Sequence, residues 1–330
     1  MTESDPLVSI VMGVHNGECD LAKTMDSILS QTFDNFEFIV VDDGSTDRSA
    51  ELLTAFAQRD RRVVVVSQEN QGLTRALITG SEHASGHILA RQDVGDVSNP
   101  ERLARQVEYL HAHPEVVAVS TGYRRVGPKG EYLGSQVREM TPAEVTSVLL
   151  NEGAGIPHTA AMIRMDAFQK AGGYRAAFRF AQDSDLWYRL SEHGLLAELN
   201  ESLFDWGIDT GGISASNRHR QQSLADLARQ CYDARRAGDG ESELLKRAEV
   251  VSWESTPAGG DAAFIDPSAA AEFFIGSQLY ALKDSRCRAY LRRAIRRHPV
   301  WPAAWAKLAL SYLRSPRVPA LDQSGRALES

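Results

Sequence analysis

The stretch Phe36-Glu37-Phe38-Ile39-Val40-Val41-Asp42-Asp43-Gly44-Ser45 (residues 36–45) decides the fold of this 330-residue chain. Its first six residues are mostly β-branched or aromatic, which predicts a strand, and the acids, glycine and serine after them predict a turn. Apolar runs and helical spacings alternate around this stretch. Strands are expected at 8–12, 63–66 and 87–90, and helices at 21–29, 49–56 and 73–83. This alternation indicates an α/β fold in which a mostly parallel sheet carries helices on both faces.

The rest of the chain continues with shorter elements and ends in helices. Helices are expected at 101–111, 142–150, 166–171 and 183–193, and strands at 116–120, 122–126 and 158–163. Glycines and prolines cluster at Gly238-Asp239-Gly240 and Pro257-Ala258-Gly259-Gly260, which predicts a linker over residues 236–262. The linker separates a domain over 1–235 from a small helical region over 263–330.

Composition narrows the classes of function. The net charge of −8 argues against broad nucleic-acid binding, which needs a basic surface. Cys19, Cys231 and Cys287 are too far apart in sequence for a C-x-x-C pair, so we expect free thiols in a reducing compartment. No apolar run approaches the ~20 residues that span a bilayer, and the short acidic stretch 1–6 is unlike a signal peptide. We therefore expect a cytoplasmic protein.

Polar clusters follow three of the first four expected strands, where ligands bind in open α/β sheets. They are His15-Asn16, Asp42-Asp43-Gly44-Ser45 and Gln92-Asp93-Val94-Gly95-Asp96. An acid in the second cluster can accept hydrogen bonds from ribose hydroxyls or from the imide N–H of a base, or can belong to a turn before a capped helix. Because Gly13-Val14-His15-Asn16-Gly17 lacks G-x-G-x-x-G, a nicotinamide-dependent dehydrogenase is disfavoured.

Two further acidic motifs suggest chemistry. Asp93 and Asp96 are three residues apart at a strand end, where they can hold a divalent cation or simply form a turn. In Gln182-Asp183-Ser184-Asp185, a carboxylate at a helix start can deprotonate an acceptor hydroxyl or stabilise the helix dipole. We expect Asp183 to be the base and Asp185 to stabilise the helix.

Four segments, in order, resemble family 2 glycosyltransferases of the GT-A fold. They are residues 8–16 (VSIVMGVHN), 40–47 (VVDDGSTD), 90–96 with 100–103 (ARQDVGD and PERL), and 180–187 (FAQDSDLW). The resemblance covers roughly residues 7–225. It implies an inverting transfer from a nucleotide-diphosphate sugar to an acceptor hydroxyl, in polysaccharide or glycoconjugate assembly. It divides the main domain into a nucleotide-sugar half, about 1–115, and an acceptor half, about 116–235.

The resemblance also assigns roles to residues. It implies that Asp183 is the general base, that Asp42 contacts the nucleoside, and that Asp93 lies near the ribose and the metal. The full set expected at the nucleotide is Val14, His15, Asn16, Asp42, Asp43, Gly72 and Asp93. The residues expected at a divalent cation, Mn²⁺ or Mg²⁺, are Asp93 and Asp96. The residues expected at the acceptor or donor pocket are His158, Gln182, Trp187, Arg218 and His219, with a buried core position as the alternative for His158 and Trp187.

The sequence departs from the family pattern in several places. Gly95 replaces the second acid of the D-x-D motif and Asp96 follows it, while Gly13 and His15 stand where proline and tyrosine are frequent. Asparagine is common in the family where this chain has Ile78, and glutamate is more frequent where it has Gln182. Gly95 keeps open an alternative, a catalytically degenerate GT-A scaffold that uses its C-terminal helices for interaction.

The resemblance also suggests partners. The donor would carry UDP, dTDP or GDP, and the acceptor would be a saccharide or a lipid-linked molecule. Arginines over residues 286–297 form one face of an expected helix. They allow peripheral contact with the inner face of a membrane, or are simply a solvated surface.

Overall fold

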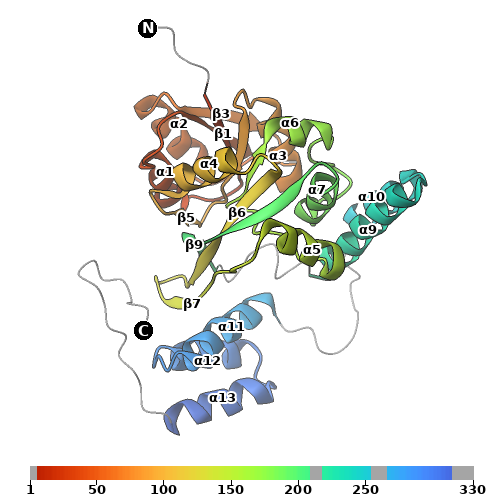
Figure 1. Cartoon of the computed structure of the whole chain (residues 1–330). Helices are drawn as coiled ribbons and strands as arrows, with labels where there is room; N and C mark the ends of the chain where they lie inside the picture. Colours follow the sequence, from red (N-terminus) through yellow and green to blue (C-terminus); the bar gives the residue numbers. More distant parts are fainter. Residues whose placement is uncertain (1–5, 209–217, 254–265, 314–330) are drawn as a thin grey trace. The chain divides into compact units, whose positions relative to one another are not determined.

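The computed structural model of the protein describes residues 6–208, 218–253 and 266–313, which fall into two compact units (Figure 1). The sheet unit comprises the described residues of 1–123, 137–205 and 219–255. The helical unit comprises those of 124–136, 206–218 and 256–330.

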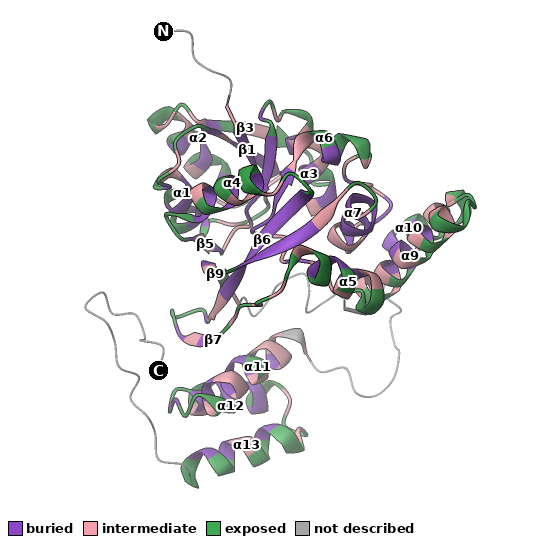
Figure 2. Ribbon diagram, viewed as in Figure 1, coloured by how far each residue is buried: buried purple, intermediate pink, exposed green. Residues whose placement is uncertain are grey.

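A mixed sheet organises the sheet unit, with strand order β3-β2-β1-β4-β8-β6-β9-β5. The first three neighbour pairs in this order are parallel, whereas β8 is antiparallel to β4 and β6, and β5 is antiparallel to β9. The strands are β1 (Val8–Val14), β2 (Phe36–Asp43), β3 (Val63–Gln68), β4 (Ile88–Arg91), β5 (Val97–Ser98), β6 (Val116–Val126), β8 (Met162–Arg164) and β9 (Leu195–Gly207). The central strands are buried along most of their length (Figure 2).

Helices cover both faces of the sheet, as the sequence predicts. One face packs α1 (Leu21–Leu29), α2 (Ser49–Arg59) and α4 (Arg102–Ala112) against strand residues such as Ile10 and Phe38. The other face packs a second core around Val11 and Ile39. Its helices are α3 (Leu73–Glu82), α5 (Pro142–Glu152), α6 (Met165–Lys170), α7 (Gln182–Leu190), α9 (Arg218–Ala237) and α10 (Ser242–Trp253). Neighbouring residues of a strand face opposite cores because side chains alternate along it.

Some elements differ from the sequence prediction. The two strands expected at 116–120 and 122–126 are one continuous strand, β6, because Thr121 stays buried and its hydroxyl donates to the carbonyl of Glu201 at 2.5 Å. The strand expected over 158–163 is confined to β8. The residues before β8 form a turn in which the Ala161 amide donates to the His158 carbonyl at 3.1 Å.

The region expected to be a linker contains a packed helix. Helix α10 lies within 236–262, and its Ala248 is fully buried while Leu244 and Val251 pack against the core of the sheet unit. The glycines at 238 and 240 form only the turn between α9 and α10, in which Gly238 has a φ of 79°. The described part of the expected linker therefore belongs to the sheet unit.

The helical unit has its own small core. It contains β7 (Tyr132–Gln136), which pairs with β6, and the helices α11 (Pro267–Ala281), α12 (Cys287–Arg297) and α13 (Pro302–Leu313). Leu133 packs with apolar residues of all three helices, and the Tyr290 hydroxyl donates to Glu131 at 2.7 Å. No helix in the described parts of the chain is both long and apolar enough to cross a membrane.

Candidate active site

The candidate site lies at the carboxyl ends of β1, β2 and β4, where the parallel strands end together. Register places Val14 beside Asp42 and Val11 beside Arg91, so the loops after the three strands emerge at one edge of the sheet. Val14 is 1% exposed and packs in the core of the α1, α2 and α4 face, so its side chain offers no polar group to the site.

Hydrogen bonds join the loops after β1 and β2. The Asn16 amide donates to Ser45 Oγ at 3.0 Å, and Asn16 Oδ1 accepts from the Thr46 amide at 2.7 Å. Asn16 has a φ of 53°, a left-handed conformation that asparagine tolerates better than most residues. A ring nitrogen of His15 lies 3.0 Å from the Asp43 carbonyl and 2.9 Å from Asn70 Nδ2. The exposed His15 ring is therefore fixed at the rim of the site.

The adjacent acids Asp42 and Asp43 have different partners. The buried carboxylate of Asp43 accepts from Gln68 Nε2 at 2.7 Å, from the Gln71 amide at 2.9 Å and from the Gly72 amide at 2.7 Å. These bonds shape the loop before α3, so Asp43 positions that loop. The Asp42 carboxylate accepts only from the Ser45 amide, at 3.1 Å, within the described residues. Asp42 thus keeps an oxygen for a ligand.

Gly72 occupies a position that needs glycine. Its φ is 88°, and a Cβ atom there would lie 3.2 Å from Nε of Arg179. The guanidinium of Arg179 stacks over the Trp253 ring, 4.4 Å from its centroid, and has no carboxylate partner among the described residues. The structure therefore places a cation beside the loop that Asp43 holds.

Asp93 is held by a fully buried arginine. Arg91 donates from Nη2 to Asp93 Oδ1 at 2.5 Å, and from Nη1 to the carbonyls of Val11 at 2.9 Å and Gln92 at 3.1 Å. Burial, the largest single influence, would raise the pKa of Asp93. The charge of Arg91 and smaller contributions, which include hydrogen bonds from Arg91 and Thr159, together outweigh it, so the pKa lies below its usual value. The Asp93 side chain remains 34% exposed, so an ionised carboxylate faces the site.

Asp96 and Gly95 differ from Asp93 in their surroundings. Asp96 is 4% exposed and its Oδ2 accepts from Thr159 Oγ1 at 2.5 Å. Gly95 has a φ of 95°, which explains why glycine stands there: a side chain would strain the backbone. Among the described residues, no three His, Cys, Asp or Glu side chains are placed to hold a metal together. Of the two predicted metal ligands, Asp93 is thus the one whose side chain is partly exposed at the site. A single carboxylate suits a cation that a bound substrate also coordinates through its oxygens.

Asp183 lies in the first turn of α7, near Asp93. Its Oδ1 accepts from the Ser184 amide at 2.8 Å. Burial is the main reason that the pKa of Asp183 is raised, and the negative charge of Asp93 raises it further. Two carboxylates that influence each other therefore have pKa values shifted in opposite directions.

His158 and Tyr174 complete this cluster. A ring nitrogen of His158 lies 2.8 Å from the Tyr174 hydroxyl. Burial, followed by the charge of Arg91, lowers the pKa of His158 to about 3, so the imidazole is neutral at pH 7. Burial, with the charges of Asp93 and Asp183 also contributing, raises the pKa of Tyr174. The neutral pair supplies hydrogen bonds without a charge.

The other residues of the Asp183 motif support the structure. Asp185 is 1% exposed and is bound by two guanidinium groups, those of Arg175 and Arg189. The expected interaction with the helix dipole is thus secondary to a buried ion-pair network. Trp187 is buried against Gly155, where a Cβ atom would lie 2.3 Å from the indole, and its ring meets His158 edge-on at 5.7 Å. Gln182 is buried at the first position of α7.

The basic residues expected at the pocket lie at the start of α9. His219 is exposed, and the Arg218 side chain lies outside what the structure describes. The next residue, Arg220, is 5.7 Å from the ring of Phe180, three residues before Asp183. The first turn of α9 is thus brought near the α7 end of the site.

Sequence reasoning assigned no role to three residues of the site. Arg91 is a charged residue in an apolar strand, two positions before an acid, and that signal could have identified it. Tyr174 and Arg179 follow no motif, and only the fold brings them here.

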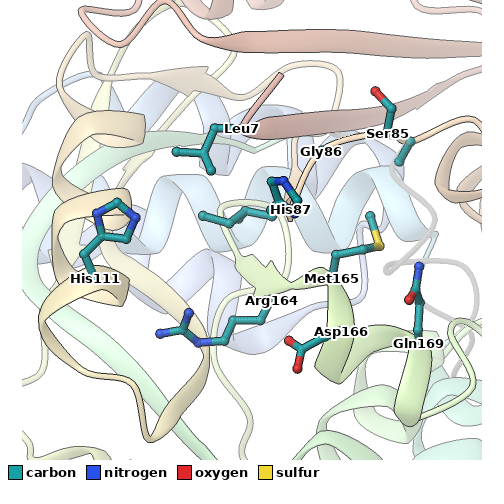
Figure 3. Close-up of a pocket in the computed structure, with 11 residues that line it drawn as sticks. Leu7, Ser85, Gly86, His87, His111, Arg164, Met165, Asp166 and Gln169 are labelled. Atoms are coloured by element: carbon teal, nitrogen blue, oxygen red, sulfur yellow. The ribbon is translucent and has the colours of Figure 1, made fainter. Parts of the chain in front are cut away.

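A separate pocket of about 480 Å³ lies at the opposite end of the strands (Figure 3). Its lining includes Leu7 just before β1, His87 before β4 and His111 of α4, with Asp166 and Gln169 on α6. Asp166 is paired with Lys170 at 2.9 Å. The pocket is therefore distinct from the carboxylate cluster.

The chain is similar to known glycosyltransferases. The profile of a family described as "Glycosyl transferase family 2" matches residues 9–172. The Bacillus subtilis (strain 168) protein named "Putative glycosyltransferase EpsE" is 34% identical over 209 residues, which are 61% of this chain and 73% of that protein.

Solved structures show the same fold. Residues 1–349 of S. aureus TarS in complex with UDP align with a TM-score of 0.55 at 15% identity, covering 92% of this chain and 88% of that one. The mannosyltransferase PcManGT from Pyrobaculum calidifontis, in complex with GDP-Man and Mn²⁺, aligns with a TM-score of 0.54 at 17% identity, covering 94% and 85%. The expected GT-A fold is confirmed by these similarities.

Proposed function

Because the chain belongs to glycosyl transferase family 2, and is thus a glycosyltransferase, we propose that it is an inverting enzyme. It would move a sugar from a nucleotide-diphosphate donor to an acceptor hydroxyl in polysaccharide or glycoconjugate assembly. The donor would carry UDP, dTDP or GDP, because related folds hold UDP in TarS and GDP-Man in PcManGT. The acceptor would be a saccharide or a lipid-linked molecule.

The observation that carries this proposal is the pair of carboxylates with opposite pKa shifts. Arg91 keeps Asp93 ionised, so Asp93 is suited to a cation or to donor hydroxyls. Asp183 has a raised pKa, so its carboxylate is a stronger base than that of an exposed aspartate. Environments that separate two neighbouring acids in this way are typical of sites that assign them different roles.

In the proposed step, Asp183 accepts the proton of the acceptor hydroxyl. The acceptor oxygen forms a bond to the anomeric carbon from the side opposite the donor's diphosphate. The bond between that carbon and the diphosphate oxygen breaks, and its electrons leave with the nucleoside diphosphate. The configuration at the carbon is therefore inverted.

Each other residue of the site would bind or orient a reactant. Asp42 would accept hydrogen bonds from the nucleoside through its free oxygen, beside the loop that Asp43 holds. Asp93 would hold a divalent cation, Mn²⁺ or Mg²⁺, together with the donor. A cation bound there would supply positive charge to offset the negative charge on the departing diphosphate. His158 and Tyr174, both uncharged, would orient the acceptor without competing with Asp183 for its proton.

The test measures release of nucleoside diphosphate from a panel of UDP-, dTDP- and GDP-sugars, with Mn²⁺ and a mixture of saccharide acceptors. We expect one donor to be turned over. Asp183→Asn should lower the rate about 10²–10⁴-fold, the usual range for loss of a general base, while calorimetry shows unchanged donor binding. The matched control is Asp26→Asn, an exposed acid on α1. Full activity in Asp183→Asn would overturn the assignment of the base.

A further inference from the structure

The outer face of α13 is apolar and largely exposed. Ala304, Leu308 and Ser311 bury one stripe of this helix in the core of the helical unit. The remaining residues are largely exposed, as the green stretches of α13 in Figure 2 show. They include Trp305, 53% exposed, and Leu313, 82% exposed.

This exposed face carries no charge. Pro302, Ala303, Trp305, Ala306, Ala309, Leu310, Tyr312 and Leu313 are its exposed residues. The single cation of α13, Lys307, instead lies over the ring of Phe273 at 5.0 Å. Val300, just before α13, extends the apolar surface. A contiguous apolar helix face that is exposed to water usually marks a surface that binds a partner.

The neighbouring helix α12 supplies an excess of positive charge. Residues 266–313 contain eight Lys and Arg but three Asp and Glu, a net charge of +5 in a chain of net charge −8. The three acids are already in ion pairs, Asp284 with Arg286, and Glu272 and Asp266 with arginines of α12.

Two exposed arginines remain for a partner. Arg296 has no ion pair within the described residues, and Arg292 donates to the hydroxyl of Tyr312 at the end of α13. That hydrogen bond places Arg292 beside the apolar face, and Arg296 lies one turn further along the exposed face of α12.

We propose that this surface, Trp305, Leu310 and Leu313 of α13 with Arg292 and Arg296 of α12, binds an anionic phospholipid membrane. A helix whose apolar side chains enter the boundary between headgroups and acyl chains, with cations beside it, has the chemistry of an interfacial anchor. The basic side chains then lie against lipid phosphates.

The net charge of the helical unit argues against a second copy of the chain as the partner of this surface. Two such faces in contact would bring two regions of net charge +5 together, and like charges repel across an interface. An anionic lipid surface has the complementary charge. Membrane binding is separate from sugar transfer, and it would bring the proposed enzyme to its acceptor where that acceptor is lipid-linked.

The experiment is co-sedimentation of the full chain with vesicles of phosphatidylcholine, alone or with about one third phosphatidylglycerol, without any sugar donor. We expect binding to the anionic vesicles and its loss as salt is added. Arg292→Gln with Arg296→Gln should weaken it roughly 25-fold, at about fivefold for each arginine. Leu310→Asp should weaken it by at least about tenfold.

Matched controls lie in the sheet unit. Val250→Asp changes an exposed apolar residue of α10, and Arg236→Gln an exposed arginine of α9, and both should bind like the wild type. The arginine variants test the proposal even if Leu310→Asp fails to fold. No binding, equal binding to neutral vesicles, or equal losses in the controls would overturn it. A wild-type dimer that Leu310→Asp separates, without vesicle binding, would identify a second copy as the occupant instead. Because no donor is present, these outcomes are independent of whether the proposed transfer occurs.

Discussion

Two aspartates of one helical turn should respond in opposite ways when each is replaced by asparagine. Asp183 faces the site with a raised pKa, whereas Asp185 is 1% exposed between Arg175 and Arg189. The substitution removes the same charge at both positions. The expected difference therefore arises from what surrounds each side chain.

Asp185→Asn should destabilise the sheet unit strongly. The Arg189 side chain is 6% exposed and that of Arg175 is 17% exposed, so loss of the carboxylate leaves two poorly hydrated cations together. Removing one partner of a buried ion pair costs about 3–5 kcal/mol. For a unit of this size, about 2–4 °C of Tm is lost per kcal/mol, so Tm should fall by roughly 6–20 °C.

Asp183→Asn should instead raise Tm at pH 7. A raised carboxyl pKa means that the folded state binds a proton more tightly than the unfolded state does. The stability of the wild type therefore falls as pH rises from the unfolded-state pKa of Asp183 through its folded-state pKa. At neutral pH this buried carboxyl is a cost to the free energy of unfolding. Asparagine removes that cost and also removes the base, so Tm should rise while transfer is lost.

The assay is thermal unfolding of both variants at pH 7 and at pH 4, with nucleoside diphosphate release measured below either Tm. The advantage of Asp183→Asn over the wild type should shrink at pH 4, where the wild-type carboxyl is more protonated. A wild-type Tm in Asp185→Asn would refute the ion-pair account. A fall in Tm in Asp183→Asn would refute the conclusion that the buried Asp183 carboxyl destabilises the folded state at pH 7.

Three further outcomes are expected. Between about pH 4 and 8, kcat/KM should rise with pH through one transition that lies above the ordinary aspartate pKa of 3.8, because Asp183 acts in its deprotonated form. A second transition near pH 6.5 would contradict the neutral state of His158, whose pKa is about 3. Asp42→Ala should weaken nucleotide binding about tenfold to 100-fold in calorimetry with little change in Tm, since a hydrogen bond to a charged acceptor contributes about 1.5–3 kcal/mol. Unchanged affinity would show that Asp42 does not contact the nucleotide. Arg91→Met should lower the free energy of unfolding, measured in urea, by about 2–4 kcal/mol, because two buried carbonyls lose their donor. It should also raise the pKa of Asp93, so that, as pH is lowered, metal-dependent donor binding weakens at a higher pH than in the wild type. An unaltered pH dependence would show that Arg91 does not control Asp93.

Local patterns predicted most of the parallel sheet. Continuous apolar runs such as Phe38-Ile39-Val40-Val41 are long enough to identify strands, and their order with the helices allows few topologies. Helix α9 was missed because residues 218–237 are rich in arginine and glutamine and carry a weak apolar stripe. The position of α10 could not be predicted, since the glycines before it are equally typical of a linker and of a tight turn.

The sequence motifs predicted the acids of the candidate site but not the residues that hold those acids. Motifs identify Asp42, Asp93 and Asp183. Asp42 and Asp93 lie at one edge because strand ends converge in a parallel sheet, whereas Asp183 begins helix α7. The separate roles of Asp42 and Asp43 depend on where the backbone of Gln71 and Gly72 passes, which is a tertiary fact. The pKa shifts likewise depend on non-local neighbours of each carboxylate.

The central claim is that the candidate site at the carboxyl ends of β1, β2 and β4 binds a nucleotide-diphosphate sugar with Asp93 at the diphosphate. Calorimetric titration of UDP, dTDP and GDP, each with and without Mn²⁺, tests it most directly in the wild type and in Asp93→Ala. We predict that one nucleotide binds, that Mn²⁺ strengthens its binding, and that Asp93→Ala removes the gain from Mn²⁺. Absence of binding by all three nucleotides, or a gain from Mn²⁺ that persists in Asp93→Ala, would contradict the claim.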